Sequence, residues 1–164
     1  MSSLSKRTQQ GFTIVELLIV IVVIGILAAL VITTYNGIQQ KGRNTERTTD
    51  LKAIQGQLEA FYATNGRYPT SANLGSTSAT NVAFIQSEMK GLDKEALRDP
   101  KATATPLDYS LASSPTANKY SYAPSGDAAG STCDNTPTGG DCTKYVLTAK
   151  PEGSGADIVQ NSLN

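Results

Sequence analysis

The side chains of this 164-residue chain that could do chemistry are few, and none of them is a histidine. Histidine is the commonest general base and transition-metal ligand, so its absence removes the usual centre of an enzyme site. The serines, tyrosines and carboxylates form no Ser/His/Asp, Cys/His or paired-carboxylate pattern with recognisable spacing. The sequence therefore argues against an enzyme and predicts neither a catalytic residue nor a cofactor.

Cys133 and Cys142 are the only two cysteines, and they lie nine positions apart among Asp, Asn, Thr, Pro and Gly residues. Two cysteines without a histidine are too few for a structural zinc site. The pair predicts a disulfide in an oxidising compartment, which places the C-terminal part of the chain outside the cytoplasm. The loop 133–142 is then either a stapled exposed loop or a surface loop presented for adhesion.

Three aspartates in and around this loop are the remaining metal-ligand candidates, because calcium binds several oxygen ligands at once. They are Asp127, Asp134 and Asp141. A calcium site on these residues is kept as an alternative to the purely structural loop.

An apolar run from Phe12 to Ile32 is 21 residues long, and only Thr13, Glu16 and Gly25 within it are not hydrophobic. At about 1.5 Å per residue, a helix of this length measures roughly 31 Å, which matches the hydrocarbon core of a bilayer. A cleaved secretory signal normally has an apolar core of about 7–15 residues, and a buried core helix is similarly short. The run therefore predicts a membrane-spanning helix.

Glu16 lies near the start of this run, where a carboxylate costs about 2.5–3.5 kcal/mol on membrane-insertion scales. Two interpretations are open on physical grounds alone. In one, the side chain snorkels to the cytoplasmic interface. In the other, the carboxylate pairs with a cation supplied by a neighbouring subunit.

The residues around this acid resemble the prepilin signature of type IV pilins and of type II secretion pseudopilins. The shared features are a short leader with Lys6 and Arg7, a Gly11–Phe12 junction, Glu16 at the fifth position after that junction, and the apolar helix. In that family a prepilin peptidase cuts after the glycine and methylates the new terminus. The resemblance implies that Gly11 ends the leader and that Phe12 becomes the N-methylated terminus. It also implies that Glu16 attracts the terminal ammonium of a neighbour during assembly.

Two consequences follow from this resemblance. The cut removes Lys6 and Arg7, which leaves twelve basic against fourteen acidic side chains. Thr33 stands where many pilins carry a proline, so local melting of the helix in a filament stays an open question. Gly25 weakens the helix by about 1 kcal/mol relative to alanine.

The same helix is expected to continue to about Tyr62 or a few residues further, because no proline occurs in the range 35–65. Gly66 and Pro69 then provide a helix stop. An apolar stripe with 3-4-3 spacing lies on one face of this second half and needs a cover. The stripe consists of Leu51, Ile54, Leu58 and Phe61.

Residues 39–50, between the apolar run and the stripe, contain no aliphatic or aromatic side chain. We interpret them as a solvated helical collar just above the membrane. The alternatives are ion pairs between subunits and contacts with lipid head groups. The charged members are Lys41, Arg43, Glu46, Arg47 and Asp50.

The remainder of the chain predicts a small α+β head. Asn65–Thr70 resembles the segment that ends the long helix in many pseudopilins and some pilins. Ser71–Asn81 is interpreted as a surface connection, and short helices are expected over 82–89 and 93–98. Strand candidates lie at 107–111, 119–123, 144–149 and 156–163, and three or four antiparallel strands would cover the stripe.

The predicted organisation has four parts. They are a cleaved leader over 1–11, a transmembrane or filament-core helix over 12–34, an amphipathic helix over 35–65 that continues into the head, and a globular head over 66–164. The resemblance implies a precursor that crosses the cytoplasmic membrane once, with its C-terminus outside, and an extracellular filament after assembly.

The leading functional hypothesis is a structural subunit of a type IV pilus, with motility, adhesion or DNA uptake as its use. The implied partners are prepilin peptidase, an assembly platform in the inner membrane and further copies of the chain. The alternatives are a pseudopilin of a type II secretion system and a signal-anchored surface binding protein that never polymerises. The head carries eight Lys+Arg against ten Asp+Glu, so its charge gives no support for nucleic-acid binding.

Overall fold

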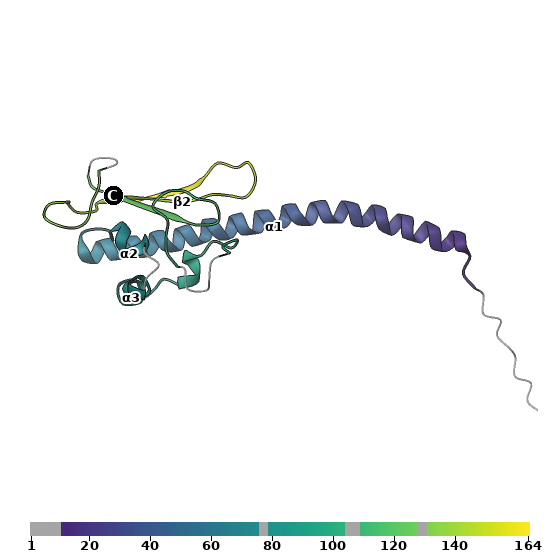
Figure 1. Ribbon diagram of the computed structural model, residues 1–164, viewed down its shortest axis with the longest axis horizontal. Helices are drawn as coiled ribbons and strands as arrows, with labels where there is room; N and C mark the ends of the chain where they lie inside the picture. The colour runs from purple at the N-terminus through teal and green to yellow at the C-terminus, as the bar shows by residue number, and fades with distance from the viewer. Residues whose placement is uncertain (1–10, 76–78, 104–108, 128–130) are drawn as a thin grey trace, which may run out of the picture. The chain divides into compact units, whose positions relative to one another are not determined.

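The computed structural model describes residues 11–75, 79–103, 109–127 and 131–164. The chain divides into two compact units, one ending at Gln39 and the other beginning at Gln40. A single helix, α1, runs from Ile14 to Asn65 and passes through this border. Figure 1 shows the elements that follow it. They are α2 (Ser71–Gly75), α3 (Ala79–Glu88), the 3-10 helix η1 (Lys94–Leu97), β1 (Ser121–Ser125), β2 (Lys144–Ala149) and β3 (Ile158–Asn161).

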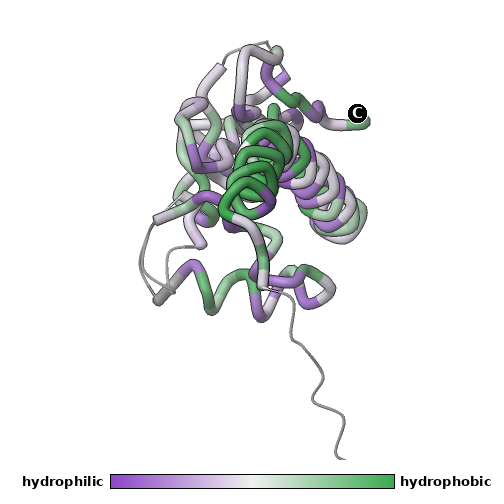
Figure 2. The backbone as a smooth tube through the Cα atoms, turned by 90° about the vertical axis from the view of Figure 1, so that its right-hand side faces the viewer, coloured by the Kyte–Doolittle hydropathy of each residue, from purple (hydrophilic) through white to green (hydrophobic). Residues whose placement is uncertain are grey.

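The first unit is the apolar half of α1, whose hydrophobic turns are green in Figure 2. Its large apolar side chains are exposed, from 48% at Val23 to 85% at Ile14. Among the described residues, α1 is the one helix long and apolar enough to cross a membrane. The helix continues through Gly25 and Thr33 without a break. An uncovered apolar surface of this length is stable only in lipid or against other apolar helices.

The end of α1 follows from two residues. Gly66 adopts a left-handed backbone with φ +69°, and its N–H donates to the carbonyl of Tyr62 at 2.7 Å. A non-glycine residue would be strained in this conformation, so the helix stops here as the sequence predicts.

The second unit is built on the predicted stripe. Leu51, Ile54 and Leu58 are fully buried, and they share one core with Tyr122, Leu147 and other residues of the sheet. Phe61 is only half-buried and packs on Phe84, with ring centroids 5.7 Å apart. The long helix with an antiparallel sheet against its second half confirms the predicted α+β fold (Figure 1).

The sheet has the order β1-β2-β3, with both pairs antiparallel. Tyr122 of β1 lies opposite Leu147 of β2, and both side chains face the core because strand residues alternate between faces. β2 has the predicted bounds, β1 is shifted by two residues from its predicted start, and β3 is shorter than predicted. Of the strand candidate 107–111, residues 107 and 108 lie outside the described residues, and residues 109–111 form no strand.

The interpretation of Ser71–Asn81 as a plain connection is wrong, because α2 and the start of α3 lie within it. Thr70 caps α2: its N–H and hydroxyl donate to Asn73 Oδ1 at 3.0 and 2.6 Å, and Asn73 N–H donates back to the hydroxyl. Leu74 then anchors this turn in the core. Local capping and one buried leucine thus outweigh a composition rich in Ser and Gly. The two other short helices appear as α3 and η1.

Candidate functional site: the start of α1 and the head

Thr13 and Glu16 form a capping box at the start of α1. The N–H and the hydroxyl of Thr13 both donate to Glu16 Oε2, at 2.9 and 2.7 Å. The N–H of Glu16 donates to the Thr13 hydroxyl at 3.2 Å. Because free N–H groups give a helix start a partial positive charge, a carboxylate is favoured here. The Thr-x-x-Glu spacing signals this role of Thr13, which is not among the predictions from sequence.

The capping box provides Glu16 with partners inside its own chain. A carboxylate held at the helix start is less costly in an apolar surrounding than an unpaired one. Thr13 contributes its own N–H, which a cut between Gly11 and Phe12 leaves intact. The box is therefore compatible with both the precursor and a processed chain.

The Gly11–Phe12 bond lies in non-helical backbone ahead of α1. Phe12 is 90% exposed, and a Cβ built on Gly11 meets no atom within 4 Å. An exposed, non-helical peptide can enter a protease site without unfolding its neighbours. The leader side chains Lys6 and Arg7 lie outside the described residues.

Cys133 and Cys142 form a disulfide, as the sequence predicts. The loop is docked against the segment after α1 rather than presented freely. Tyr68 N–H donates to Cys142 O at 2.7 Å, and Asn135 Nδ2 donates to Tyr68 O at 2.9 Å. Asn135 Oδ1 also accepts from Cys142 N–H at 2.8 Å. The disulfide therefore fixes an asparagine that ties two backbone segments together.

The three candidate calcium ligands have different surroundings. Two of them contact other side chains, and the third is exposed. Asp134 accepts from the N–H and hydroxyl of Thr136 at 2.9 and 2.6 Å. Asp141 lies 3.4 Å from Arg67, and Asp127 is exposed. Across the described ranges, no three His, Cys, Asp or Glu side chains gather into a group that could hold a metal ion. The calcium alternative gains no support from this arrangement.

The charged collar is not simply solvated, which corrects part of the sequence interpretation. Arg47 is fully buried and binds Asp99 through two hydrogen bonds, Nε to Oδ2 at 2.7 Å and Nη2 to Oδ1 at 2.8 Å. Arg43 pairs with Glu152. Lys41 and Glu46 remain exposed, as expected of a solvated face. Periodicity could not reveal Arg47, because its partner lies 52 positions away.

These ion pairs hold the groups in their charged forms. The hydrogen bonds that Arg47 donates to Asp99 raise the pKa of Arg47 above its usual value. The Arg43 guanidinium lowers the pKa of Glu152 to about 2. A depressed folded-state pKa stabilises the fold above the ordinary value of 4.5, and this stabilisation is lost as pH falls towards 2. The ion-pair cluster of Arg43, Arg47, Asp99 and Glu152 is therefore intact at neutral pH.

Three tyrosines of the head bind carboxylates of α1 through their hydroxyl groups. Tyr68 and Tyr145 both donate their hydroxyls to Glu59 of α1, at 2.8 and 2.7 Å. Tyr120 donates to Asp50 of α1 at 2.6 Å. Burial raises the pKa of all three phenols, so they remain protonated donors. Each hydroxyl thus ties the core to a carboxylate of the helix.

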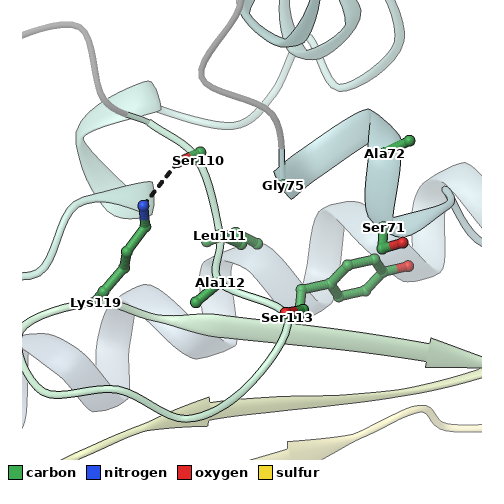
Figure 3. A pocket seen from close by; sticks show the side chains of 9 residues that line it. Ser71, Ala72, Gly75, Ser110, Leu111, Ala112, Ser113 and Lys119 are labelled. Atoms are coloured by element: carbon green, nitrogen blue, oxygen red, sulfur yellow. Dashed lines mark hydrogen bonds between the residues drawn. The ribbon is translucent and has the colours of Figure 1, made fainter.

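A cavity of about 380 Å³ lies between α2 and residues 110–113 (Figure 3). In it, Lys119 Nζ donates to Ser110 Oγ at 2.9 Å. A serine and a lysine at this distance have the geometry of a nucleophile–base dyad. Ser110 is only 3% exposed, however, and its hydroxyl accepts from Lys119 rather than donating a proton to it. The contact is that of a hydrogen-bonded structural pair.

Part of this chain is similar to known proteins. The family model for the prokaryotic N-terminal methylation motif matches residues 6–32. The chain is 38% identical over 66 residues to the type II secretion system core protein G of Dickeya chrysanthemi, covering 40% of this chain and 43% of the relative. Its counterpart in Klebsiella pneumoniae is 40% identical over 65 residues, or 40% and 46% of the two chains.

A pilin also matches. The type IV major pilin protein PilA of Myxococcus xanthus is 39% identical over 64 residues, covering 39% of this chain and 29% of the relative. The chain thus spans less than half the length of these relatives. No solved structure matches it significantly. The chain thus carries the prokaryotic N-terminal methylation motif and is similar, over about two fifths of its length, both to type II secretion system core protein G and to a type IV major pilin.

Proposed function

We propose that this protein is a filament subunit of the pseudopilin type, similar in its role to type II secretion core protein G. In this proposal the precursor sits in the cytoplasmic membrane with its head outside, prepilin peptidase cuts it between Gly11 and Phe12, and Phe12 is methylated. The processed chains then polymerise through the first half of α1. This revises the order of the two hypotheses drawn from sequence, because the relatives favour the secretion alternative.

The exposed apolar half of α1 is the observation that carries the proposal. Its large apolar side chains are uncovered over more than five turns, and one acid, Glu16, stands at its start. A membrane anchor alone has no need for an acid in its apolar part. A helix that leaves lipid to pack against copies of itself gains from an acid that can bind the ammonium of the next chain.

A type IV pilin is the second candidate, and the similarity to PilA supports it. The two candidates share processing and polymerisation and differ in where the filament extends. We distinguish them by electron microscopy of producing cells with antibodies against the head. Filaments confined to the cell envelope support the pseudopilin, and long external filaments support the pilin.

Cross-linking tests polymerisation itself. A cysteine introduced at Leu18, which is exposed on α1, adds the one free thiol to a chain whose native cysteines are paired. We expect an oxidant to convert the processed protein into covalent dimers when the assembly machinery is present. The same thiol in a strain without prepilin peptidase is the control. A strictly monomeric product in both strains would favour the signal-anchored binding protein instead.

A further inference from the structure

The loop between β2 and β3 makes contacts that a sheet connection does not need. It comprises residues 150–157 and reaches back to α1 at Arg43 and Asn44. Arg43 Nε donates to Glu152 Oε1 at 2.5 Å, and Arg43 Nη2 donates to Glu152 Oε2 at 2.7 Å. This two-pronged geometry is the strongest arrangement of an arginine–carboxylate pair.

The backbone of Glu152 is bound as well as its side chain. Its N–H donates to Asn44 Oδ1 at 2.9 Å, and its carbonyl accepts from Asn44 Nδ2 at 3.2 Å. One asparagine thus satisfies both main-chain groups of Glu152, as a paired strand would. The side chain and backbone of this residue together fix the loop to a single turn of the helix.

The cluster has an inner and an outer part. In the inner part, Arg47 and Asp99 are 0% and 1% exposed, and Arg47 Nη1 also donates to Asn44 Oδ1 at 2.7 Å. In the outer part, Arg43 and Glu152 are 26% and 10% exposed, and Lys101 Nζ approaches Glu152 Oε2 at 3.3 Å. A partly exposed pair is less costly to open than a buried one, because water can solvate the separated charges. Arg47 Nη1 also donates to Glu152 Oε1 at 3.2 Å, so the two parts share this contact. The two hydrogen bonds between Arg47 and Asp99 do not involve Glu152, so this inner pair can stay closed when Glu152 leaves.

We propose that residues 150–157 form a strap that binds α1 through Glu152, and that this latch holds residues 40–47 of the helix in place within the second unit. The second compact unit begins at Gln40, three positions before Arg43. Gly37 and Gly42 flank this border, and each lowers helix propensity by about 1 kcal/mol relative to alanine. With the latch open, residues 40–47 lose their attachment to the strap while the core around Leu51 remains packed. The strap is thus a conformational device that fixes residues 40–47 of α1 against the loop between β2 and β3.

Hydrogen exchange measured by mass spectrometry on the full chain in detergent tests the latch. In Glu152→Gln, which removes the charge but keeps the size, we expect amides in 40–47 and 150–157 to exchange at least tenfold faster. The amides of β2 should change by less than twofold. Arg43→Gln removes the same pair from the helix side, leaves the Arg47–Asp99 pair in place, and should give the same pattern.

Glu88→Gln is the matched control, because it removes one negative charge from an exposed position of α3. It should leave exchange in all these segments unchanged. Unaltered exchange in 40–47 for both latch variants would overturn the proposal. Equal acceleration of 40–47 and of β2 would also overturn it, since the strap would then serve only the global stability of the head.

Discussion

Replacing Glu16 with glutamine should abolish filament assembly while leaving membrane insertion intact. A buried pair that loses one partner costs about 3–5 kcal/mol, which corresponds to a loss of at least 100-fold in association. Insertion depends on the apolar length of α1, which the substitution does not change. Sedimentation of assembled protein, compared with the amount in the membrane fraction, measures both effects.

The glutamine variant separates two roles of Glu16, which are the cap of its own helix and the proposed pairing with a neighbouring chain. Glutamine can replace glutamate in a capping box but carries no charge. Thr13→Val is the matched variant, because it removes the hydroxyl that bonds Glu16 and keeps the carboxylate. If pairing with a neighbour is the role, Glu16→Gln fails to assemble and Thr13→Val assembles. Normal assembly by Glu16→Gln would show that Glu16 acts only as a cap.

Replacing Arg47 with alanine should lower the free energy of unfolding of the head by about 3–5 kcal/mol. Asp99 would remain buried without its guanidinium partner, and an uncompensated buried charge accounts for most of this cost. Arg47→Lys should lose less, because it keeps the charge but cannot form the two parallel hydrogen bonds. Urea unfolding followed by tyrosine near-UV circular dichroism checks the prediction, since the chain has seven tyrosines and no tryptophan.

Arg98→Ala is the matched control for this measurement. Arg98 pairs with Glu95 at 3.8 Å, and both side chains are more than a third exposed. Such a pair contributes about 0–1 kcal/mol, so the variant should unfold near the native midpoint. A loss below 1 kcal/mol for Arg47→Ala would mean that the buried pair does not hold the head together.

The elements that sequence predicts well are those with a local cause. The stripe of Leu51, Ile54 and Leu58 follows helical periodicity, and the core covers it as expected. β2 has its predicted bounds because Tyr145, Val146 and Thr148 have strong strand preference and lie together in a partly buried strand. The stop at Gly66 needs only a glycine that can adopt positive φ.

The features that sequence analysis missed depend on partners far apart in the chain. Arg47 looks like any surface arginine until the fold brings Asp99 and Glu152 to it, from 52 and 105 positions away. Thr13 differs, because its Thr-x-x-Glu pattern is local and could have been recognised. The start of α1 is therefore almost completely predictable from sequence. The ion pairs that join Arg47 to Asp99 and Glu152 are not.

We propose that the chain is a processed filament subunit, and mass spectrometry of the protein purified from its native membrane tests this claim most directly. We expect a mature chain that begins at Phe12, carries one additional methyl group at its N-terminus, and retains the Cys133–Cys142 disulfide. A strain without prepilin peptidase should yield the unprocessed chain. A native protein with an intact Met1, or one cut near Ala28–Ala29, would contradict the claim.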